Sequence, residues 1–394
     1  MATLINKQSG VLLQKPSRFN VTSTSLETQL VETFFVGQKH PIDYSPEFRK
    51  FVKEEYDHDE TSVKIDLTAG CNEFLEKPGT LSFDLLLDYL KEQRRLSKKS
   101  LAEIVYGASI VCRRGVLNKL INSPYKNEFQ FAIKKFQGIY LIKEISTESY
   151  RQQNARLSFN SHFYLPKFKN HIISPFGNES YLPPKEVSTW EQMQGVYLCE
   201  ISSKCDSIPL KIFYGTEIDA FDQENNVVEI KLQKGDFHSS PYMADKLRKW
   251  YFQAQLSNSD TIVVGFRSDN IVNCIKKIKT HDLPLLVQVE NRWHQFPSYA
   301  ATKTILSSIC EFYEKHVKPN ETLIVEMPSN GSNILYHIHD DKIENMLPKE
   351  FKDVFEETVT LVDQNAKPSK INKGYVLRTE KGWFDENIED ALKI

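Results

Sequence analysis

The sequence lacks a long hydrophobic run, a paired cysteine motif and a large net charge of either sign. No apolar stretch approaches the roughly 18 residues that a membrane span requires, which predicts that the chain does not cross a membrane. The segment Met1 to Gln8 also lacks the charged and apolar regions of a secretion signal. We therefore expect an intracellular, soluble protein. The cytoplasm is the expected compartment and the nucleus the alternative, because no basic run is long enough to indicate nuclear import.

The cysteines and the net charge narrow the classes further. The six cysteines contain no CxxC pair, so we expect reduced and mostly buried thiols and no structural zinc site. A formal net charge of −2 argues against a protein that coats nucleic acid over its whole surface. It leaves room for a local basic channel that is balanced by acidic surface elsewhere.

The apolar pattern predicts one mixed α/β domain. With 394 residues and 40% hydrophobic content, the chain can bury a large core. Residues 1–30 carry few large apolar side chains and are expected to form a loose lead-in, so that a single catalytic domain would span 31–394. Strands and helices are expected by their periodicity. The strands are expected at 128–136, 138–145, 195–201, 208–221, 227–233, 261–267, 322–327 and 334–338, and the main helices at 82–90, 115–121, 242–256 and 299–316.

Three carboxylates and one amine recur at every second position of two neighbouring apolar segments. Glu217 and Asp219 stand on the first segment, and Glu229 and Lys231 stand on the second. Residues i and i+2 of a strand point to the same side, so each pair shares a face. The polar stretch 222–226 favours a hairpin. Its register would place Asp219 opposite Glu229. Glu217 would then lie opposite Lys231.

Such a cluster needs a counter-charge. Carboxylates on an apolar sheet repel one another and are costly to desolvate unless a cation lies among them. Three carboxylates suit one or two Mg²⁺ or Mn²⁺ ions better than Zn²⁺, which favours His and Cys. The pattern predicts a metal-dependent phosphodiesterase centre in which Lys231 stabilises charge on the phosphate. The alternative is an exposed hairpin face with ordinary surface charge.

The helix expected at 242–256 could add a phosphate-binding wall. Lys246, Lys249, Trp250 and Gln253 are three or four residues apart and share one face of that helix. Lys249 would then bind substrate phosphate beside Gln253. In the alternative, Trp250 belongs to the buried stripe, while Lys249 and Gln253 are solvated at its margin.

Four segments form an ordered set of motifs. They read Ile-Val-Cys-Arg-Arg-Gly-Val-Leu-Asn-Lys-Leu at 110–120, Gly-Thr-Glu-Ile-Asp at 215–219, Val-Glu-Ile-Lys at 228–231, and Ile-Val-Val-Gly-Phe-Arg at 262–267 behind the helix that starts near Lys246. In this order they resemble the DXO/Dom3Z family of RNA 5′-end decapping exonucleases, with the chain as a divergent, fungal-type member. The resemblance covers about residues 63 to 340.

The resemblance implies a role for each motif residue. Arg114 would contact a substrate phosphate, Lys231 would be the catalytic lysine, and Gln253 would be the active-site glutamine. The implied metal ligands are all carboxylates: Glu200, Glu217, Asp219 and Glu229.

One motif departs from the family pattern, which usually reads Gly-Tyr-Lys-Phe-Glu before the acidic pair. This chain has Gly-Val-Tyr-Leu-Cys-Glu at 195–200. Counting back from Glu200 puts Val196 at the glycine position and Leu198 at the lysine position. Glu200 could still act beside the metals and the substrate. The missing positive charge predicts weak or absent pyrophosphohydrolase activity on 5′-triphosphate ends.

The resemblance also implies a fold and an activity. The fold would be two twisted mixed β-sheets packed together with flanking helices, related to ExD…ExK metal-dependent nucleases. The hydrolase would bind the 5′ end of single-stranded RNA, capped or uncapped. It would remove incomplete or non-standard caps, including NAD-type caps, as an intact unit and degrade the RNA 5′ to 3′. The rival is a non-catalytic partner that stabilises a separate 5′–3′ exoribonuclease. We expect a monomer, and binding to an exoribonuclease is left open.

Overall fold

The structure is a computed structural model of the chain. It describes residues 7–8, 24–37, 42–76, 82–125, 128–148, 151–152, 159–175, 186–203, 208–237, 242–328, 333–340, 346–356, 378–379 and 382–383. The chain divides into two compact units, Met1–Glu356 and Glu357–Ile394. The second unit contains the paired strands β17 (Arg378–Thr379) and β18 (Gly382–Trp383). The single domain expected over 31–394 is thus divided after Glu356.

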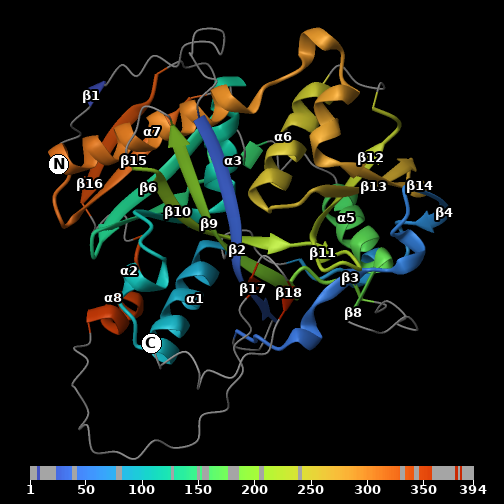
Figure 1. Ribbon diagram of the computed structural model, residues 1–394, viewed down its shortest axis with the longest axis horizontal. Helices are drawn as coiled ribbons and strands as arrows, with labels where there is room; N and C mark the ends of the chain where they lie inside the picture. The colour runs from blue at the N-terminus through green and yellow to red at the C-terminus, as the bar shows by residue number, and fades with distance from the viewer. Residues whose placement is uncertain are drawn as a thin grey trace, which may run out of the picture. The chain divides into compact units, whose positions relative to one another are not determined.

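A mixed nine-stranded sheet forms one layer of the first unit, in the order β1-β16-β15-β6-β7-β5-β10-β9-β2 (Figure 1). Strand β5, next to the central strand β7, is parallel to both of its neighbours, β7 and β10, and the other pairs are antiparallel. The strands are β1 (Lys7–Gln8), β2 (Thr24–Val36), β5 (Ile110–Arg113), β6 (Phe129–Phe136), β7 (Ile139–Glu144), β9 (Gln192–Ser203), β10 (Leu210–Ile218), β15 (Glu321–Met327) and β16 (Leu335–Asp340). Parallel pairing at the centre requires both faces to be covered.

The start of β2 corrects the expected lead-in. The strand begins at Thr24 and pairs with β9 along its whole length, so residues 24–30 are part of the sheet. Leu26 and Leu30 lie on one face of this strand and pack against the core, while the side chains between them are polar. That alternation is typical of a strand with one solvated face, which polar composition alone concealed.

A mixed seven-stranded sheet forms the second layer, in the order β4-β14-β13-β12-β11-β3-β8. Its strands are β3 (Lys50–Val52), β4 (Glu60–Asp66), β8 (Ile173–Pro175), β11 (Ala220–Phe221), β12 (Val227–Lys234), β13 (Thr261–Ser268) and β14 (Ile271–Lys279). The prediction of two mixed sheets with helices is confirmed.

The helices cover the sheets on defined faces. They are α1 (Ser82–Ser97), α2 (Leu101–Ile104), α3 (Arg114–Asn122), α5 (Phe159–Ile172), α6 (Met243–Leu256), α7 (Gln295–His316) and α8 (Lys349–Glu356), with short 3₁₀ helices at Pro46–Phe48, Glu54–Tyr56, Cys71–Glu73, Ser123–Tyr125, Thr280–Leu286 and Val289–Asn291. Among the described residues, no helix is long and apolar enough to cross a membrane.

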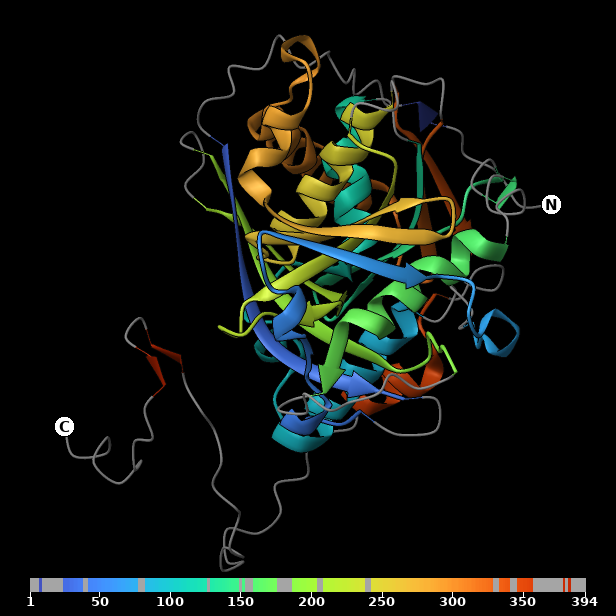
Figure 2. The same cartoon turned by 90° about the vertical axis from the view of Figure 1, so that its right-hand side faces the viewer.

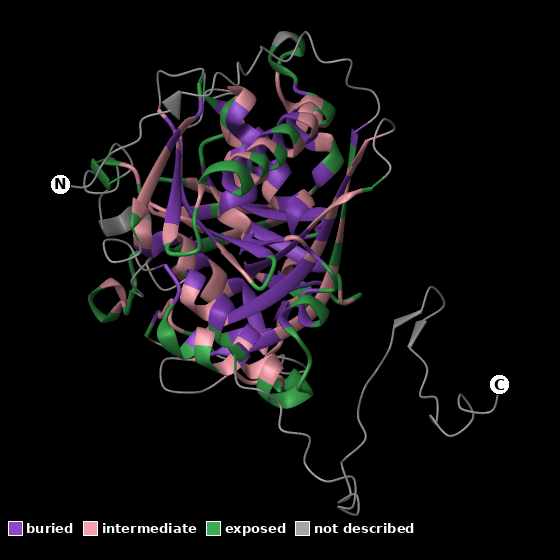
Figure 3. Ribbon diagram, turned by 90° about the vertical axis from the view of Figure 1, so that its left-hand side faces the viewer, coloured by how far each residue is buried: buried purple, intermediate pink, exposed green. Residues whose placement is uncertain are grey.

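Three large cores define the layers. In the first, α3, α6 and α7 pack on one face of the larger sheet and also contact β13 of the smaller sheet. In the second, α1, α2 and α8 cover the opposite face of the larger sheet. In the third, α5 packs on the smaller sheet (Figure 2). Buried residues accordingly concentrate on the strands and on the helix faces that touch them (Figure 3).

The hairpin expected between the two acidic pairs is only partly correct. β10 ends at Ile218 and pairs with β9 and β5 in the larger sheet, whereas β11 belongs to the smaller sheet. Only Ala220 and Phe221 pair with β12. The chain therefore crosses from one sheet to the other at Asp219, and Glu217 does not lie opposite Lys231. The turn at 222–226 forms as expected, but pairing of β10 with β5 and β9 keeps Glu217 in the larger sheet.

Helix α5 was not expected from the sequence, and it contributes a side chain to the site. Phe163, Phe168 and Ile172 are buried against the smaller sheet. Phe168 lies directly over Gly265 of β13, where an added Cβ would meet the ring at 2.6 Å. Glycine at position 265 is thus required for the close approach of this helix.

We predict that Gly265→Ala destabilises the fold by about 1–3 kcal/mol, because the new methyl group overpacks against Phe168. Urea denaturation followed by circular dichroism measures this. Combining it with Phe168→Leu, which shortens the opposing side chain, should recover part of the loss relative to the sum of the single changes. Strict additivity of the two changes would contradict the contact.

Candidate active site

Glu229 is the most buried charged side chain of the site. It stands on β12 with a side-chain exposure of 3%, and a guanidinium N–H of Arg114, the first residue of α3, is hydrogen-bonded to its Oε1 atom. Lys231 Nζ donates to Glu229 Oε2, and Ser257 Oγ donates to Oε1 at 2.6 Å. Burial raises the pKa of Glu229, but the charges of Arg114 and Lys231 and the hydrogen bonds lower it by a larger amount. The net pKa therefore lies well below 4.5. Glu229 is therefore ionised.

Glu217 and Asp219 converge on an ammonium group from α5. Lys169 Nζ lies 2.5 Å from Asp219 Oδ1 and 3.2 Å from Glu217 Oε1. Burial lowers the pKa of Lys169, but the two carboxylates raise it well above its ordinary value, so the amine is charged. Burial raises the pKa of Glu217, but the positive charge of Lys169 and its hydrogen bond lower this pKa by more, so the net pKa lies below its ordinary value. Asp219 also accepts the Ile230 backbone N–H at 2.8 Å, which joins it to the strand of Glu229.

The pair Glu217 and Asp219 lies next to the pair Glu229 and Lys231, and we call these four side chains the centre. Arg114 connects the two pairs through its charge. It lowers the pKa of Glu217 and of Glu229, and Asp219 in turn raises the pKa of Arg114. The oxygen donors suit a hard divalent cation, and Lys169 Nζ marks a point where two of the carboxylates already meet one positive charge. Within the described ranges, no three Asp, Glu, His or Cys side chains converge on a single point.

A cavity of about 200 Å³ opens beside this centre. Its lining includes Glu217 and Asp219 and two amines, Lys169 from α5 and Lys50 from β3. Burial lowers the pKa of Lys50, while the nearby carboxylates Glu191 and Glu217 oppose the shift. The cavity thus presents carboxylates together with cationic groups, which a phosphate ester coordinated to a metal requires.

Two glutamines of β9, which the sequence did not indicate, adjoin Glu217. The β9–β10 ladder places Gln194 opposite Glu217, and Gln192 Nε2 donates to Glu217 Oε2 at 3.2 Å. Gln194 is fully buried and accepts a hydrogen bond of 2.9 Å from Arg113. The β9 side chains next to Glu217 are therefore neutral amides.

Glu200, which we expected to contact the metal and the substrate, does not belong to this site. It pairs with Lys211 across the ladder and forms an exposed ion pair with it at 2.9 Å. Glu200 lies six residues further along β9 than Gln194, a distance of about 20 Å at 3.3–3.4 Å per residue. Counting along the motif placed Glu200 at the site. It gave no information on how β9 pairs with β10, and that pairing puts Glu200 opposite Lys211.

The residues expected on α6 lie near the site to different degrees. Gln253 is half-buried at the end of the helix, and its carbonyl accepts from Ser257, the residue that also contacts Glu229. Lys249 is exposed one turn earlier on the same face. Trp250 is buried, which agrees with the alternative in which it belongs to the buried stripe of the helix. Lys246 Nζ lies 4.9 Å from the centroid of its ring. The roles of Gln253 and Lys249 stay predictions.

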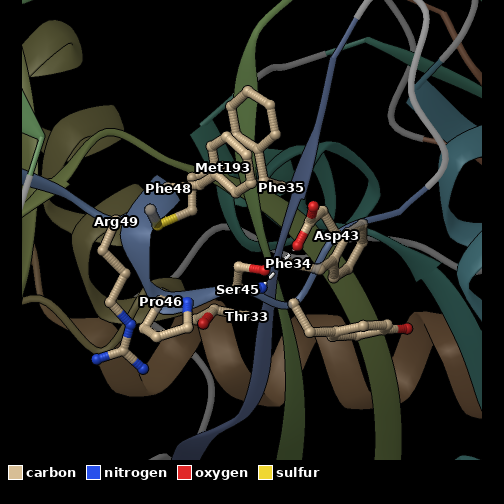
Figure 4. Close-up of a pocket in the computed structure, with 10 residues that line it drawn as sticks. Thr33, Phe34, Phe35, Asp43, Ser45, Pro46, Phe48, Arg49 and Met193 are labelled. Atoms are coloured by element: carbon tan, nitrogen blue, oxygen red, sulfur yellow. Dashed lines mark hydrogen bonds between the residues drawn. The ribbon is translucent and has the colours of Figure 1, made fainter.

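A second, smaller cavity of about 40 Å³ is lined in part by Met193 (Figure 4). The rings of Phe35 and Phe48 stack there at a centroid distance of 4.5 Å. Met193 borders both cavities. None of the residues expected to act in the site lines the smaller cavity, so it carries no role here.

The family model of the RAI1-like PD-(D/E)XK nucleases matches residues 33–352. The chain belongs to this family, a class of metal-dependent nuclease folds, as the sequence motifs implied. Among individual proteins, the chain is similar to the decapping nuclease dom-3 of Caenorhabditis elegans, with 26% identity over 268 residues. That alignment covers 64% of this chain and 66% of the relative.

Two solved structures share the fold. The Rai1 protein of Candida albicans, in complex with pU5 and Mn²⁺, has a TM-score of 0.71 at 15% identity and covers 90% of this chain and 100% of its own. The Rai1 protein of Scheffersomyces stipitis, in complex with (3′-NADP)⁺ and calcium, has a TM-score of 0.69 at 16% identity and covers 89% and 100%. At these identities the likeness concerns the fold.

We predict that Arg114→Met costs about 3 kcal/mol of stability near pH 7, because it leaves Glu229 buried with one cation fewer. The pKa of Glu229 is lowered in the folded state, so the stabilisation exists above the ordinary pKa of 4.5 and is lost as the pH falls below it. The difference between variant and wild type should therefore shrink toward about pH 3.

Denaturant titrations at both pH values measure this difference. The matched control is Arg151→Met, which removes a guanidinium from the exposed carboxylate of Glu148 and should change little at either pH. A cost at Arg114 that does not depend on pH would contradict the assigned pairing with an ionised Glu229.

Proposed function

We propose that the protein is a divalent-metal-dependent decapping nuclease that acts on RNA 5′ ends. The observation that carries the proposal is the convergence of Glu217 and Asp219 on one cationic point beside a cavity, with Glu229 and Lys231 at the same centre. The family, the decapping nuclease among the relatives, and the RNA and NADP⁺ ligands of the structural neighbours support it.

The metal ligands would be Glu217, Asp219 and Glu229. A bound Mg²⁺ or Mn²⁺ supplies Lewis-acid catalysis, activating water and stabilising charge on the phosphodiester. Lys231 is held by its hydrogen bond to Glu229, and its ammonium would stabilise charge that develops on the phosphate. Arg114 adds a second cation that is held by the same carboxylate. The amine-lined cavity would hold the 5′-terminal phosphates.

The substrate would be the 5′ end of single-stranded RNA with an incomplete or NAD-type cap, which leaves as an intact unit, followed by 5′–3′ degradation. A monomer in the cytoplasm or the nucleus, with or without an exoribonuclease partner, is compatible with this chemistry. The non-catalytic alternative predicts a wild-type protein that is inactive and binds an exoribonuclease tightly.

We predict that wild-type protein releases product from 5′-labelled capped RNA in the presence of Mn²⁺, and that Glu217→Ala with Asp219→Ala abolishes the release. Lys231→Ala should lower kcat by roughly 10²–10³-fold, the usual effect of losing one preorganised electrostatic contact. Gel analysis of the labelled product measures the rates, and circular dichroism confirms folding.

Glu200→Gln is the matched control for that experiment. It removes a carboxylate from the same pair of strands, but the exposed pair with Lys211 lies far from the centre, so decapping should be unchanged. A loss as large as that of the Glu217 and Asp219 variants would contradict the site described here. Chelation by EDTA should stop the reaction in every active variant.

We further predict slow pyrophosphate release from 5′-triphosphate RNA, because Leu198 stands at the lysine position of the family motif and the side chain beside Glu217 is the neutral Gln192. Gln192→Lys should raise the release at least tenfold by placing a cation next to Glu217. Decapping measured in the same preparation separates this gain from a general change in activity. Rapid release by the wild type would contradict the prediction.

A further inference from the structure

We propose that residues 71–76 set the width of the cavity beside the centre and thereby determine which RNA 5′ ends the protein prefers. The proposal rests on the decapping function, because it compares substrates of that reaction. We call residues 71–76 the anchor segment and residues 187–191 the rim segment. None of the described residues that line the cavity belongs to the anchor segment, so its members act as positioning residues.

The rim segment forms part of the cavity wall. Ser188, Thr189 and Glu191 line the cavity, and Gln192 continues the same wall at the start of β9. Four residues of α5 also line it: Leu165, Pro166, Lys169 and Asn170. Because α5 is packed on the smaller sheet through Phe168, the contacts that hold the rim segment determine how wide the cavity is.

The anchor segment holds the rim segment through the backbone of one residue. The N–H of Leu75 donates to the carbonyl of Val187 at 3.0 Å, and the N–H of Thr189 donates to the carbonyl of Leu75 at 3.0 Å. Leu75 thus forms one step of a parallel ladder with Ser188. Val187 is buried in the third core, whereas Leu75 is 41% exposed. The link therefore depends on the backbone groups of Leu75 and little on its side chain.

The end of the rim segment nearer to β9 has separate support. Lys50 Nζ donates to the carbonyl of Glu191 at 3.2 Å, and Gln192 pairs with Val36 in the ladder of β2 and β9. Loss of the anchor would therefore release residues 187–189 and leave Gln192 in place beside Glu217.

The anchor segment is itself tied to α5. The rings of Phe74 and Phe163 meet edge to face, with their centroids 5.3 Å apart, and Phe163 is fully buried in the third core. Glu76 Oε1 lies 3.1 Å from His162 Nδ1 on the same helix. The anchor segment thus connects α5 with the rim segment, which are two parts of the same cavity wall.

The size of the cavity distinguishes between RNA 5′ ends. Its volume is about 200 Å³, whereas sites that enclose a drug-sized ligand occupy roughly 300–1,000 Å³. A terminal phosphate fits this volume, but a nucleotide-sized cap requires the wall to move outward. The two backbone hydrogen bonds of Leu75 oppose that movement. Intact bonds therefore favour a small 5′ end, and their loss favours a bulky one.

The test variant is Leu75→Pro, which removes the N–H that binds Val187. Phe74 has φ −77° and ψ 124°, the extended conformation that a following proline requires. We expect KM for 5′-monophosphate RNA to rise roughly fivefold, the effect of losing one hydrogen bond of ordinary net strength. KM for NAD-capped RNA of the same sequence should not rise. The kcat on both RNAs should be unchanged, because Gln192 and the centre stay in place.

Leu75→Ala is the matched control. It keeps the N–H and removes only an exposed side chain, so both KM values should equal those of the wild type. Initial rates on the two labelled RNAs measure these constants. A merely structural disturbance would instead lower kcat on both RNAs alike.

A second variant and a direct structural measurement support the comparison. Phe74→Ala removes the ring that packs on Phe163 but keeps every backbone group, and should shift the two KM values in the same direction as Leu75→Pro. The result therefore does not depend on the folding of the proline variant alone. Hydrogen exchange followed by mass spectrometry should show faster exchange over residues 187–189 in Leu75→Pro and wild-type exchange in Leu75→Ala.

The outcomes separate this inference from the proposed function. Faster exchange of the rim segment with an unchanged ratio of the two KM values would overturn the specificity role and leave the decapping nuclease standing. A wild type that releases no product from either RNA would refute the proposed function. Binding of both labelled RNAs in EDTA, measured by fluorescence anisotropy, then tests the inference without turnover. A Kd ratio that Leu75→Pro does not change would overturn it.

Discussion

The burial of a charged Glu229 is the constraint on which the site depends. A carboxylate with 3% exposure is costly unless opposite charges and hydrogen bonds surround it. Arg114 from the start of α3, Lys231 from β12 and Ser257 from the end of α6 provide them. α3 and α6 also belong to the core that connects the two sheets. The ionised state of Glu229 and the packing of the two sheets therefore depend on each other.

The crossing of the chain at Asp219 gives the site its shape. Glu217 belongs to the larger sheet and Glu229 to the smaller one, and Asp219 stands between them and accepts the N–H of Ile230. A hairpin within one sheet would have aligned the four side chains in a row on a flat face. The crossing instead leaves a recess that β9, β3 and α5 enclose. The cavity is thus a consequence of the change of sheet.

Local patterns in the sequence predicted the local part of this arrangement. The period of two correctly put Glu229 and Lys231 on one face, and the motifs correctly identified the family and the two mixed sheets. The register could not be predicted, because β10 pairs with β5 and β9, which lie about 100 and 15 residues away in sequence. Glu200 was misplaced for this reason.

Lys169 had no sequence signal of its own. Its helix contains Pro166, which ordinarily interrupts a helical pattern. The excess of negative charge in the predicted acidic patch was the one indication that a cation had to be present, and a metal was the obvious candidate. A single lysine becomes visible as a counter-ion only when tertiary packing brings α5 onto the smaller sheet.

A balanced centre has a consequence for the order of folding and metal binding. Structural metal sites are often disordered until the ion arrives, because their ligands repel one another without it. Here Lys169, Arg114 and Lys231 neutralise the carboxylates in the absence of any ion. The carboxylates can therefore take up their places as the protein folds, before any ion binds.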